Sequence, residues 1–379
     1  MRYFDYNATT PVAQSVLEAM LPFFEERWGN PSSVYSFGHD LGEAIEQARR
    51  QVASLIGAES KEIVFTGCGT ESSNTALRSG VSHDPKKRHV VMSTVEHPAN
   101  LEMGERLEAE GVSVSYLPVN EDGLIELSEL KAMLRPDTAM VSMMWANNET
   151  GVTFPIADIG ALCRSRGILF HSDAVQAAGK VPLDVGAAKV DYLSLTGHKL
   201  YAPKGVGALF VRDGAPVRSL IVGGGQEKGR RAGTQNVAFI VAMGAAAEFV
   251  RSNLETEARR LGALRDRLEA ALMASTGCRR NGSAEHRLPN TTNLAFEGVE
   301  SEALLLLLDQ AGFCASSGSA CSTGSLEPSH VLTAMGVPRL SALGSVRLSL
   351  GMKTTQEDVE ALITTLPRLV ARLRGHQPG

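Results

Sequence analysis

The feature that most constrains the fold is a regular alternation of short apolar runs with longer amphipathic stretches between about residues 40 and 250. Short apolar runs predict strands, and the amphipathic stretches between them predict helices. This alternation is typical of an α/β protein with a largely parallel, doubly wound sheet. The predicted strands are Glu62–Thr66, His89–Thr94, Ser113–Leu117, Met140–Met144, Leu169–Ser172, Tyr192–Leu195 and Ala208–Val211, and the predicted helices are Leu41–Leu55, Thr70–Arg78, Ala99–Ala109, Leu127–Leu134 and Ile156–Arg166.

The pattern changes near residue 255. We predict a large domain over residues 12–254 and a smaller α+β domain over residues 255–379, with the N-terminal segment 1–11 packing on the smaller one. A helix near Ala238–Leu272 leads into a strand at Thr292–Phe296, a helix at Glu302–Ala311, a strand at Val346–Leu350 and a closing helix from about Thr355.

Composition excludes several classes of protein. The net charge of −5 over 379 residues comes without a basic block, so nucleic acid is not an expected partner. We expect no signal peptide and no apolar run long enough to cross a membrane. The five cysteines form no C-x-x-C pair, which argues against a disulfide framework or a zinc site and favours a reducing, cytoplasmic setting.

Cys321 stands out because it lies in the run S-S-G-S-A-C-S-T-G-S, residues 316–325. Free cysteine is usually buried, whereas this composition favours an accessible loop. Cys321 is therefore a candidate nucleophile that carries a group away, the alternative being a small residue in an ordinary linker.

Lys199 follows the predicted strand Tyr192–Leu195, in the sequence Thr196-Gly197-His198-Lys199. A lysine in apolar surroundings has a lowered pKa, as a Schiff-base amine needs. The alternative is an exposed loop lysine. Thr196 and His198 beside it offer hydrogen-bond donors for a phosphate.

Asp173, Gln176 and His97 lie at the ends of two other predicted strands. A carboxylate at Asp173 suits a pyridinium nitrogen, and Gln176 can bind a ring substituent. Asp173 equally suits the N-cap of a helix over Ala174–Ala178. His97 can stack on a planar ring and transfer protons, or it can cap the helix that Pro98 begins.

Three further segments complete the candidate site. Gly69 and Thr70 open a predicted helix after Glu62–Thr66, where a phosphate or a plain glycine turn would fit. Asn148 follows the strand Met140–Met144. Arg347 lies in an apolar strand, so it needs a buried partner, either a structural carboxylate or that of an amino-acid substrate.

Taken together, these motifs resemble the NifS/IscS-type cysteine desulfurases, which are pyridoxal-phosphate enzymes of fold type I. The most specific match is Ser317-Gly318-Ser319-Ala320-Cys321 with its continuation to His330. The other matching segments, in chain order, are 5–10, 29–33, 69–72, 96–98, 147–151, 171–176, 197–199 and 230–234.

The resemblance implies a role for each residue. Lys199 would hold pyridoxal phosphate covalently, and His97 would cover the ring and manage the substrate thiol proton. Arg347 and Asn148 would bind the carboxylate of L-cysteine, and Cys321 would receive the sulfur as a persulfide, leaving L-alanine. The cofactor contacts would come from Asp173 at the ring nitrogen, Gln176 at the ring oxygen, Gly69, Thr70, Thr196 and His198 at the phosphate, and Thr234 at the phosphate of the other subunit of a homodimer.

The resemblance also implies a sulfur acceptor protein, such as an iron–sulfur scaffold, and no resident metal; at most Cys321 would ligate an iron–sulfur cluster transiently. A selenocysteine lyase or another class-V aminotransferase-like enzyme stays open, as does a non-catalytic sulfur carrier. We expect Cys314 to lie buried and inert in a strand, and Cys68 to be a weaker candidate for redox sensitivity.

Overall fold

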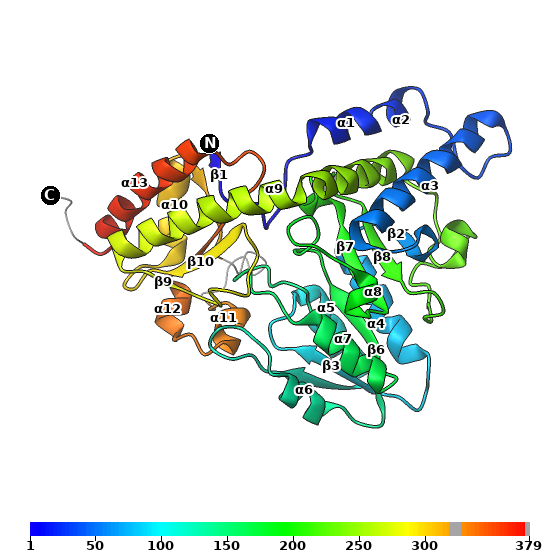
Figure 1. Ribbon diagram of the computed structural model, residues 1–379, viewed down its shortest axis with the longest axis horizontal. Helices are drawn as coiled ribbons and strands as arrows, with labels where there is room; N and C mark the ends of the chain where they lie inside the picture. The colour runs from blue at the N-terminus through cyan, green and yellow to red at the C-terminus, as the bar shows by residue number, and fades with distance from the viewer. Residues whose placement is uncertain (318–326, 376–379) are drawn as a thin grey trace.

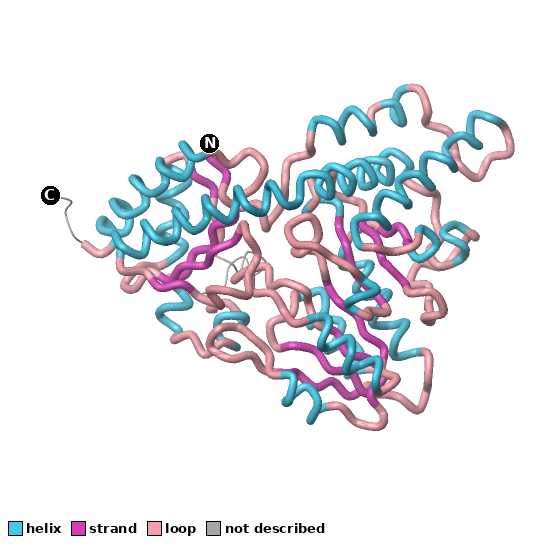
Figure 2. Tube along the Cα trace, in the orientation of Figure 1, coloured by secondary structure: helices cyan, strands magenta, loops and turns pink. Residues whose placement is uncertain are grey.

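The computed structural model describes residues 1–317 and 327–375, and its largest element is a seven-stranded sheet (Figures 1 and 2). The strand order is β2-β8-β7-β6-β5-β3-β4. All neighbours are parallel except β8, which runs antiparallel to both β2 and β7. The α/β class is thus confirmed. The strands are β2 Ile63–Thr66, β3 His89–Ser93, β4 Ser113–Leu117, β5 Thr138–Ser142, β6 Leu169–Asp173, β7 Tyr192–Thr196 and β8 Gly207–Val211.

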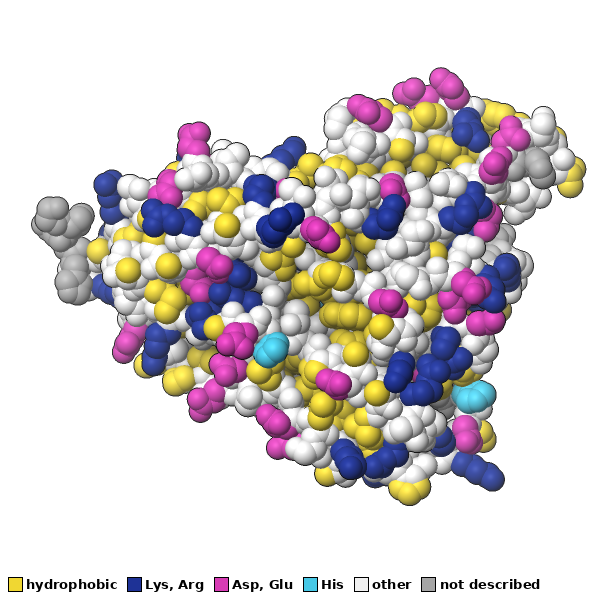
Figure 3. All heavy atoms as spheres, viewed as in Figure 1, with side chains coloured by type: hydrophobic (Ala, Val, Ile, Leu, Met, Phe, Trp, Pro, Cys, Tyr) yellow, Lys and Arg dark blue, Asp and Glu magenta, His cyan; other side chains and the backbone are white. Residues whose placement is uncertain are grey.

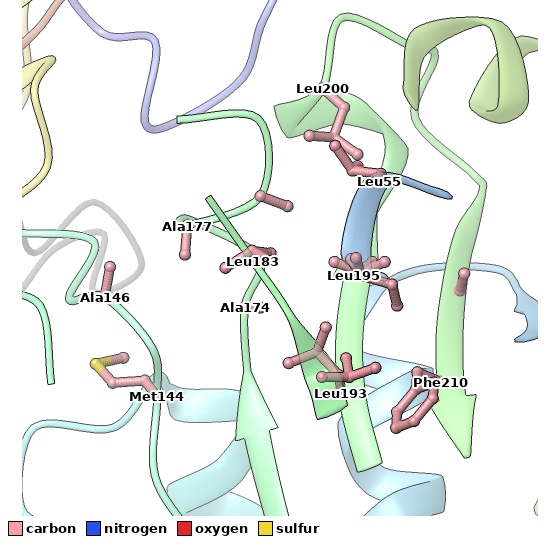
Figure 4. Close-up of a cluster of buried hydrophobic side chains, with 14 of the residues drawn as sticks. Leu55, Met144, Ala146, Ala174, Ala177, Leu183, Leu193, Leu195, Leu200 and Phe210 are labelled. Atoms are coloured by element: carbon pink, nitrogen blue, oxygen red, sulfur yellow. The ribbon is translucent and has the colours of Figure 1, made fainter. Parts of the chain in front are cut away.

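Helices cover both faces of this sheet, and successive strand residues face different cores. On β3, Val90 packs with α4 and α5, whereas Val91 belongs to the core on the other face. Figure 4 shows part of the core that contains Val91, called the first core below, where Leu193 and Leu195 of β7 lie near Phe210 of β8. The helices of this part are α1 Gln14–Met20, α2 Pro22–Glu25, α3 Ser36–Ile56, α4 Gly69–Ser82, α5 Pro98–Ala109, α6 Leu127–Met133, α7 Ile156–Ser165 and α8 Val185–Ala188, with short 3₁₀ turns η1 Ser60–Glu62, η2 Gly197–Lys199 and η3 Gln226–Gly229.

A second, smaller group of elements has its own core. Its three-stranded antiparallel sheet has the order β12-β10-β9. The N-terminal strand β1 pairs in parallel with β11, and Phe4 is fully buried in this second core. The elements are β1 Arg2–Tyr3, β9 Arg279–Arg280, β10 Thr291–Ala295, α10 Ser301–Gln310, β11 Phe313–Cys314, α11 His330–Ala334, α12 Arg339–Leu343, β12 Ser345–Ser349 and α13 Gln356–Leu373.

The helix α9, Val237–Thr276, joins the two groups as one 40-residue element (Figure 1). Its first half packs on α3 and its second half on α13. Met243 belongs to the first core and Leu268 to the second. By length and composition α9 could also cross a membrane, so the sequence-based prediction that no segment reaches that length was wrong; half of its most apolar window is buried inside the structure.

Several local expectations need correction. β5 begins and ends two residues earlier than predicted. Residues Ala174–Ala178 form turns and no helix, so Asp173 is not a helix N-cap. Cys314 lies in a strand as predicted, but it is only partly buried. On the face shown in Figure 3, acidic and basic side chains are interspersed over the surface.

Candidate active site

A cavity of about 330 Å³ lies at the carboxyl ends of β3, β6 and β7, where ligands bind in sheets of this kind. Thr234 is exposed and does not line it. Cys321 lies outside the described residues. The predicted residues that do line the cavity are Gly69, Thr70, His97, Asn148, Asp173, Gln176, Thr196, His198, Lys199 and Arg347.

Lys199 ends the turn η2 directly after β7. Its Nζ donates hydrogen bonds to the backbone carbonyls of Asn7 and Ala8, each at 2.5 Å. His198 lies beside it, with Nδ1 3.2 Å from the hydroxyl of Thr9. Burial, and then the charge of Lys199, lower the pKa of His198 to about 4, so its imidazole is neutral at pH 7. The N-terminal segment therefore forms one wall of the site.

Asp173 is the last residue of β6, and its Oδ1 accepts a hydrogen bond from the amide of Val175 at 2.9 Å. Burial raises the pKa of Asp173, which the charges of His97 and Lys199 partly oppose. A buried carboxylate is stabilised by a cationic partner, so Asp173 fits a protonated ring nitrogen.

His97 is the N-cap of α5, with Nδ1 3.1 Å from the amide of Ala99, and it also lines the cavity. Capping and facing the cavity are thus compatible for this side chain. Burial lowers the pKa of His97, so the ring is neutral; because Nδ1 accepts from Ala99, the hydrogen of the ring is on Nε2, which can donate to a ligand.

Gly69 begins the 14-residue helix α4 and lines the cavity, so the free amides of the first helical turn lie at the cavity. A Cβ at Gly69 would lie 2.9 Å from Cγ2 of Val175, so only glycine allows the close packing of these two segments. The exposed Thr70 adds a hydroxyl, and Cys68 also lines the cavity. Together with the flanking hydroxyls, this corner fits a phosphate group.

Arg347 is buried, with 3% of its surface exposed. Its Nη2 lies 2.7 Å from Oδ1 of Asp5, and its Nη1 donates to the carbonyl of Asn148 at 3.0 Å. Its Nε is buried and has no hydrogen-bond partner among residues 1–317 and 327–375. The partner left open by the sequence is thus Asp5, and the guanidinium still has a donor for a ligand carboxylate.

Residues on both sides of the segment that contains Cys321 form hydrogen bonds with Arg347 or with the neighbour of Asn148. Ser316 exchanges two backbone hydrogen bonds with Arg347, at 2.6 and 3.3 Å. On the other side, the hydroxyl of Ser329 donates to the buried carboxylate of Glu149 at 2.5 Å.

Sequence reasoning missed some residues that hold the site together. Glu96 is fully buried and accepts hydrogen bonds from Ser93, Asn100 and the amide of Met144. Glu96 was noticed only as part of a motif. Lys180, Asn7 and Asp5 support the cavity from distant parts of the chain; the only signal for Lys180 was a cationic residue inside an otherwise small and apolar stretch.

The cavity therefore fits a planar, phosphate-bearing cofactor with a ring nitrogen, attached at Lys199. Comparison with known proteins agrees with this chemistry. The family model described as aminotransferase class-V matches residues 2–362. A cysteine desulfurase of Nostoc sp. is 51% identical over 99% of this chain and 94% of its own, and the cysteine desulfurase NifS of Azotobacter vinelandii is 50% identical over the same shares.

A solved structure described as a NifS-like protein superimposes with a TM-score of 0.93 at 38% identity, covering 98% of this chain and all of that one. Fold, site and sequence therefore agree: the chain belongs to the class-V aminotransferase family, whose cofactor is pyridoxal phosphate.

Proposed function

We propose that this protein is a pyridoxal-phosphate-dependent cysteine desulfurase, which converts L-cysteine to L-alanine and leaves the sulfur on Cys321 as a persulfide. The observation that supports the proposal is that the predicted site residues lie together. Lys199, Asp173 and His97 line the same cavity as Arg347, and both flanks of the Cys321 segment are bound beside it. A transaminase would need the cavity but would have no use for a thiol there.

The substrate is oriented by its carboxylate. Arg347 has an unpartnered buried Nε, and Asn148 lies next to it. A guanidinium matches a planar carboxylate in shape and charge. Binding there leaves the amino group directed at Lys199 and the thiol free to face His97.

Each remaining residue has a task in proton or sulfur transfer. When bound, pyridoxal phosphate supplies an electron sink for the charge left when the α-proton is removed. The Lys199 amine takes that proton, and neutral His97 donates a hydrogen bond from Nε2 to the substrate sulfur, which keeps its own proton. The Cys321 thiolate forms the new S–S bond as the C–S bond of the substrate breaks. Protonation of the remaining carbon gives alanine, so one cysteine and one thiol yield one alanine and one persulfide.

We further propose that the protein is a homodimer that delivers sulfur to an acceptor protein, such as an iron–sulfur scaffold, in the cytoplasm. Thr234 is exposed and does not line its own cavity, as expected for a residue that serves a second subunit. Apolar side chains exposed nearby in sequence, at Ile221 and Val222, and those at Trp28 and Val34, support a contact with another chain. A reducing compartment keeps the persulfide chemistry of Cys321 available.

The test is to measure sulfide and alanine from L-cysteine with a reductant present. We expect equimolar products from the wild type. Cys321→Ala should keep the visible absorption of the bound cofactor and lose sulfide production, and Lys199→Ala should lose both. Cys314→Ala is the matched control, because burial raises the pKa of that thiol and makes it a poor nucleophile.

Arg347→Ala tests the carboxylate site. Losing a charged hydrogen-bond partner should raise the KM for cysteine about 10- to 100-fold while the cofactor stays bound. A Cys321→Ala variant as active as the wild type, or turnover without alanine, would contradict the proposed reaction.

A further inference from the structure

Lys180 lies beside the active site and has no role in the proposed reaction. It follows β6 by seven residues and lines a second cavity, of about 220 Å³, which it shares with Lys199. Its Nζ lies 2.7 Å from Oε1 of Gln176 and 3.1 Å from Oδ1 of Asn7. Within residues 1–317 and 327–375, no carboxylate forms an ion pair with Lys180.

Two backbone carbonyls determine how these side-chain amides are oriented. The carbonyl of Asn7 faces the Gln176 amide at 2.9 Å, and the carbonyl of Asn148 faces the Asn7 amide at 3.1 Å. A carbonyl oxygen only accepts hydrogen bonds, so each amide must turn its NH₂ group toward it. The opposite, oxygen ends of both amides therefore face Lys180.

Lys180 donates to both oxygens, and both bonds form whether its amine carries two hydrogens or three. Burial, followed by the charges of Lys199 and Arg347, lowers the pKa of Lys180. Across the shared cavity lie Glu257 of α9, Tyr6 and Tyr201.

We propose that Lys180 is a positioning residue: by binding the oxygen of Gln176, it holds the NH₂ group of that side chain toward the ring oxygen of pyridoxal phosphate. One hydrogen of this NH₂ group is taken by the carbonyl of Asn7, and the other is left for the cavity that Gln176 lines. The inference rests on the proposed attachment of the cofactor at Lys199.

The consequence concerns the proton on the nitrogen that joins Lys199 to the cofactor. A hydrogen bond to the ring oxygen stabilises its negative charge, so the Lys199 nitrogen loses its proton at lower pH. Without Lys180, the Gln176 amide keeps its bond to the carbonyl of Asn7 but loses its second anchor. The amide then holds its NH₂ group less firmly toward the ring, and the proton on the Lys199 nitrogen is held to higher pH.

The experiment is a pH titration of the visible absorption of the holoenzyme. Lys180→Met, which keeps the length of the side chain but has no donor, should move the midpoint up by about one pH unit. Gln176→Leu should give a similar shift, and the double variant no more than either alone, because the two residues act as one unit. Lys131→Met, at an exposed position of α6, is the matched control and should leave the midpoint unchanged.

Cofactor retention on dialysis is measured in parallel, so that a shift is read only from loaded enzyme. If Lys180→Met does not fold, Lys180→Leu, which also has no donor, is read by the same two criteria. A wild-type midpoint in the loaded variant, or a double-variant shift equal to the sum of the single shifts, would overturn the role of Lys180. Wild-type protein without any visible band would instead contradict the attachment at Lys199 itself.

Discussion

Glu96 is a single residue that connects several segments around the candidate site. It lies between β3 and α5, next to His97, and its carboxyl group holds the amide of Met144 after β5. Its carbonyl also accepts from His330, just after the Cys321 segment. Burial raises the pKa of Glu96 to about 7. Ionising this carboxyl group is therefore unfavourable, and the group lies where several segments of the site meet.

This raised pKa predicts a pH-dependent stability. The folded protein keeps the Glu96 proton up to about pH 7, whereas the unfolded chain releases it near 4.5. Folding therefore binds a proton between these values, and stability falls as the pH rises through this window. Relative to Glu96→Gln, the wild type should lose up to about 3 kcal/mol from the lower to the upper pH.

The measurement is the thermal midpoint of both proteins across that range. The difference between them should change up to about pH 7 and then level off. Glu105→Gln, at an exposed position of the adjacent helix α5, is the control, and its thermal midpoint should run parallel to that of the wild type. A difference between wild type and Glu96→Gln that stays constant with pH would contradict the buried, protonated carboxyl.

At the scale of single elements, the helices depend on glycines for two different reasons. Gly160 in α7 touches α8, and a Cβ there would lie 1.9 Å from the carbonyl oxygen of Ala188. Gly42 in α3 has no such neighbour within 4 Å. The first glycine is required by packing, and the second only adds flexibility to a helix.

The two positions therefore predict opposite effects of the same substitution. Gly160→Ala must push α7 and α8 apart, which should cost about 2–4 kcal/mol and lower the thermal midpoint by several degrees. Gly42→Ala should stabilise by about 0.5–1 kcal/mol, because alanine is the better helix former. Thermal unfolding of both variants is the measurement; a neutral Gly160→Ala would show that the helices can separate at no cost.

The elements also show what the sequence could predict. Strands buried on both faces, such as β3 and β6, contain short apolar runs and were placed within a residue or two. The reversed direction of β8 was missed because a strand's composition does not depend on its direction. The ten-residue link from Thr196 to Gly207, too short for a crossover helix, was the available signal.

The residues of the candidate site also fall into two groups, those that the sequence could predict and those that it could not. Residues at strand ends, such as Asp173 and Lys199, could be predicted because parallel strands bring their carboxyl ends together. Asp5 and Asn7 contact Arg347 and Lys199 over more than 180 residues of chain, and such contacts come only from the packing of the whole molecule. No local pattern encodes them.

At the scale of the whole molecule, the proposed homodimer predicts that subunits exchange a site residue. Thr234→Ala should weaken cofactor retention, and Lys199→Ala should abolish covalent attachment. In a mixed dimer of the two variants, one cavity would contain both Lys199 and the Thr234 of the neighbouring chain. Half of the sites should then retain cofactor as the wild type does.

The mixed dimer is purified with two different tags and tested by dialysis and absorption. If Thr234 served its own subunit, no site in the mixed dimer would be complete and none would be restored. Light scattering gives the independent check: a mass near the 40.4 kDa of one chain would contradict the dimer, whereas about twice that mass is expected.

The contacts of Asn7 determine when this protein can become an enzyme during its synthesis. The carbonyl that meets Lys199 belongs to the seventh residue, yet that residue is held by Thr291 and Ser349. A nascent chain that has already folded its large sheet still lacks this wall of the site until residues 291 and 349 have been translated. Translation that stops before residue 291 would leave a sheet with its lysine in place but without the anchors of Asn7, so cofactor capture should come last in biosynthesis.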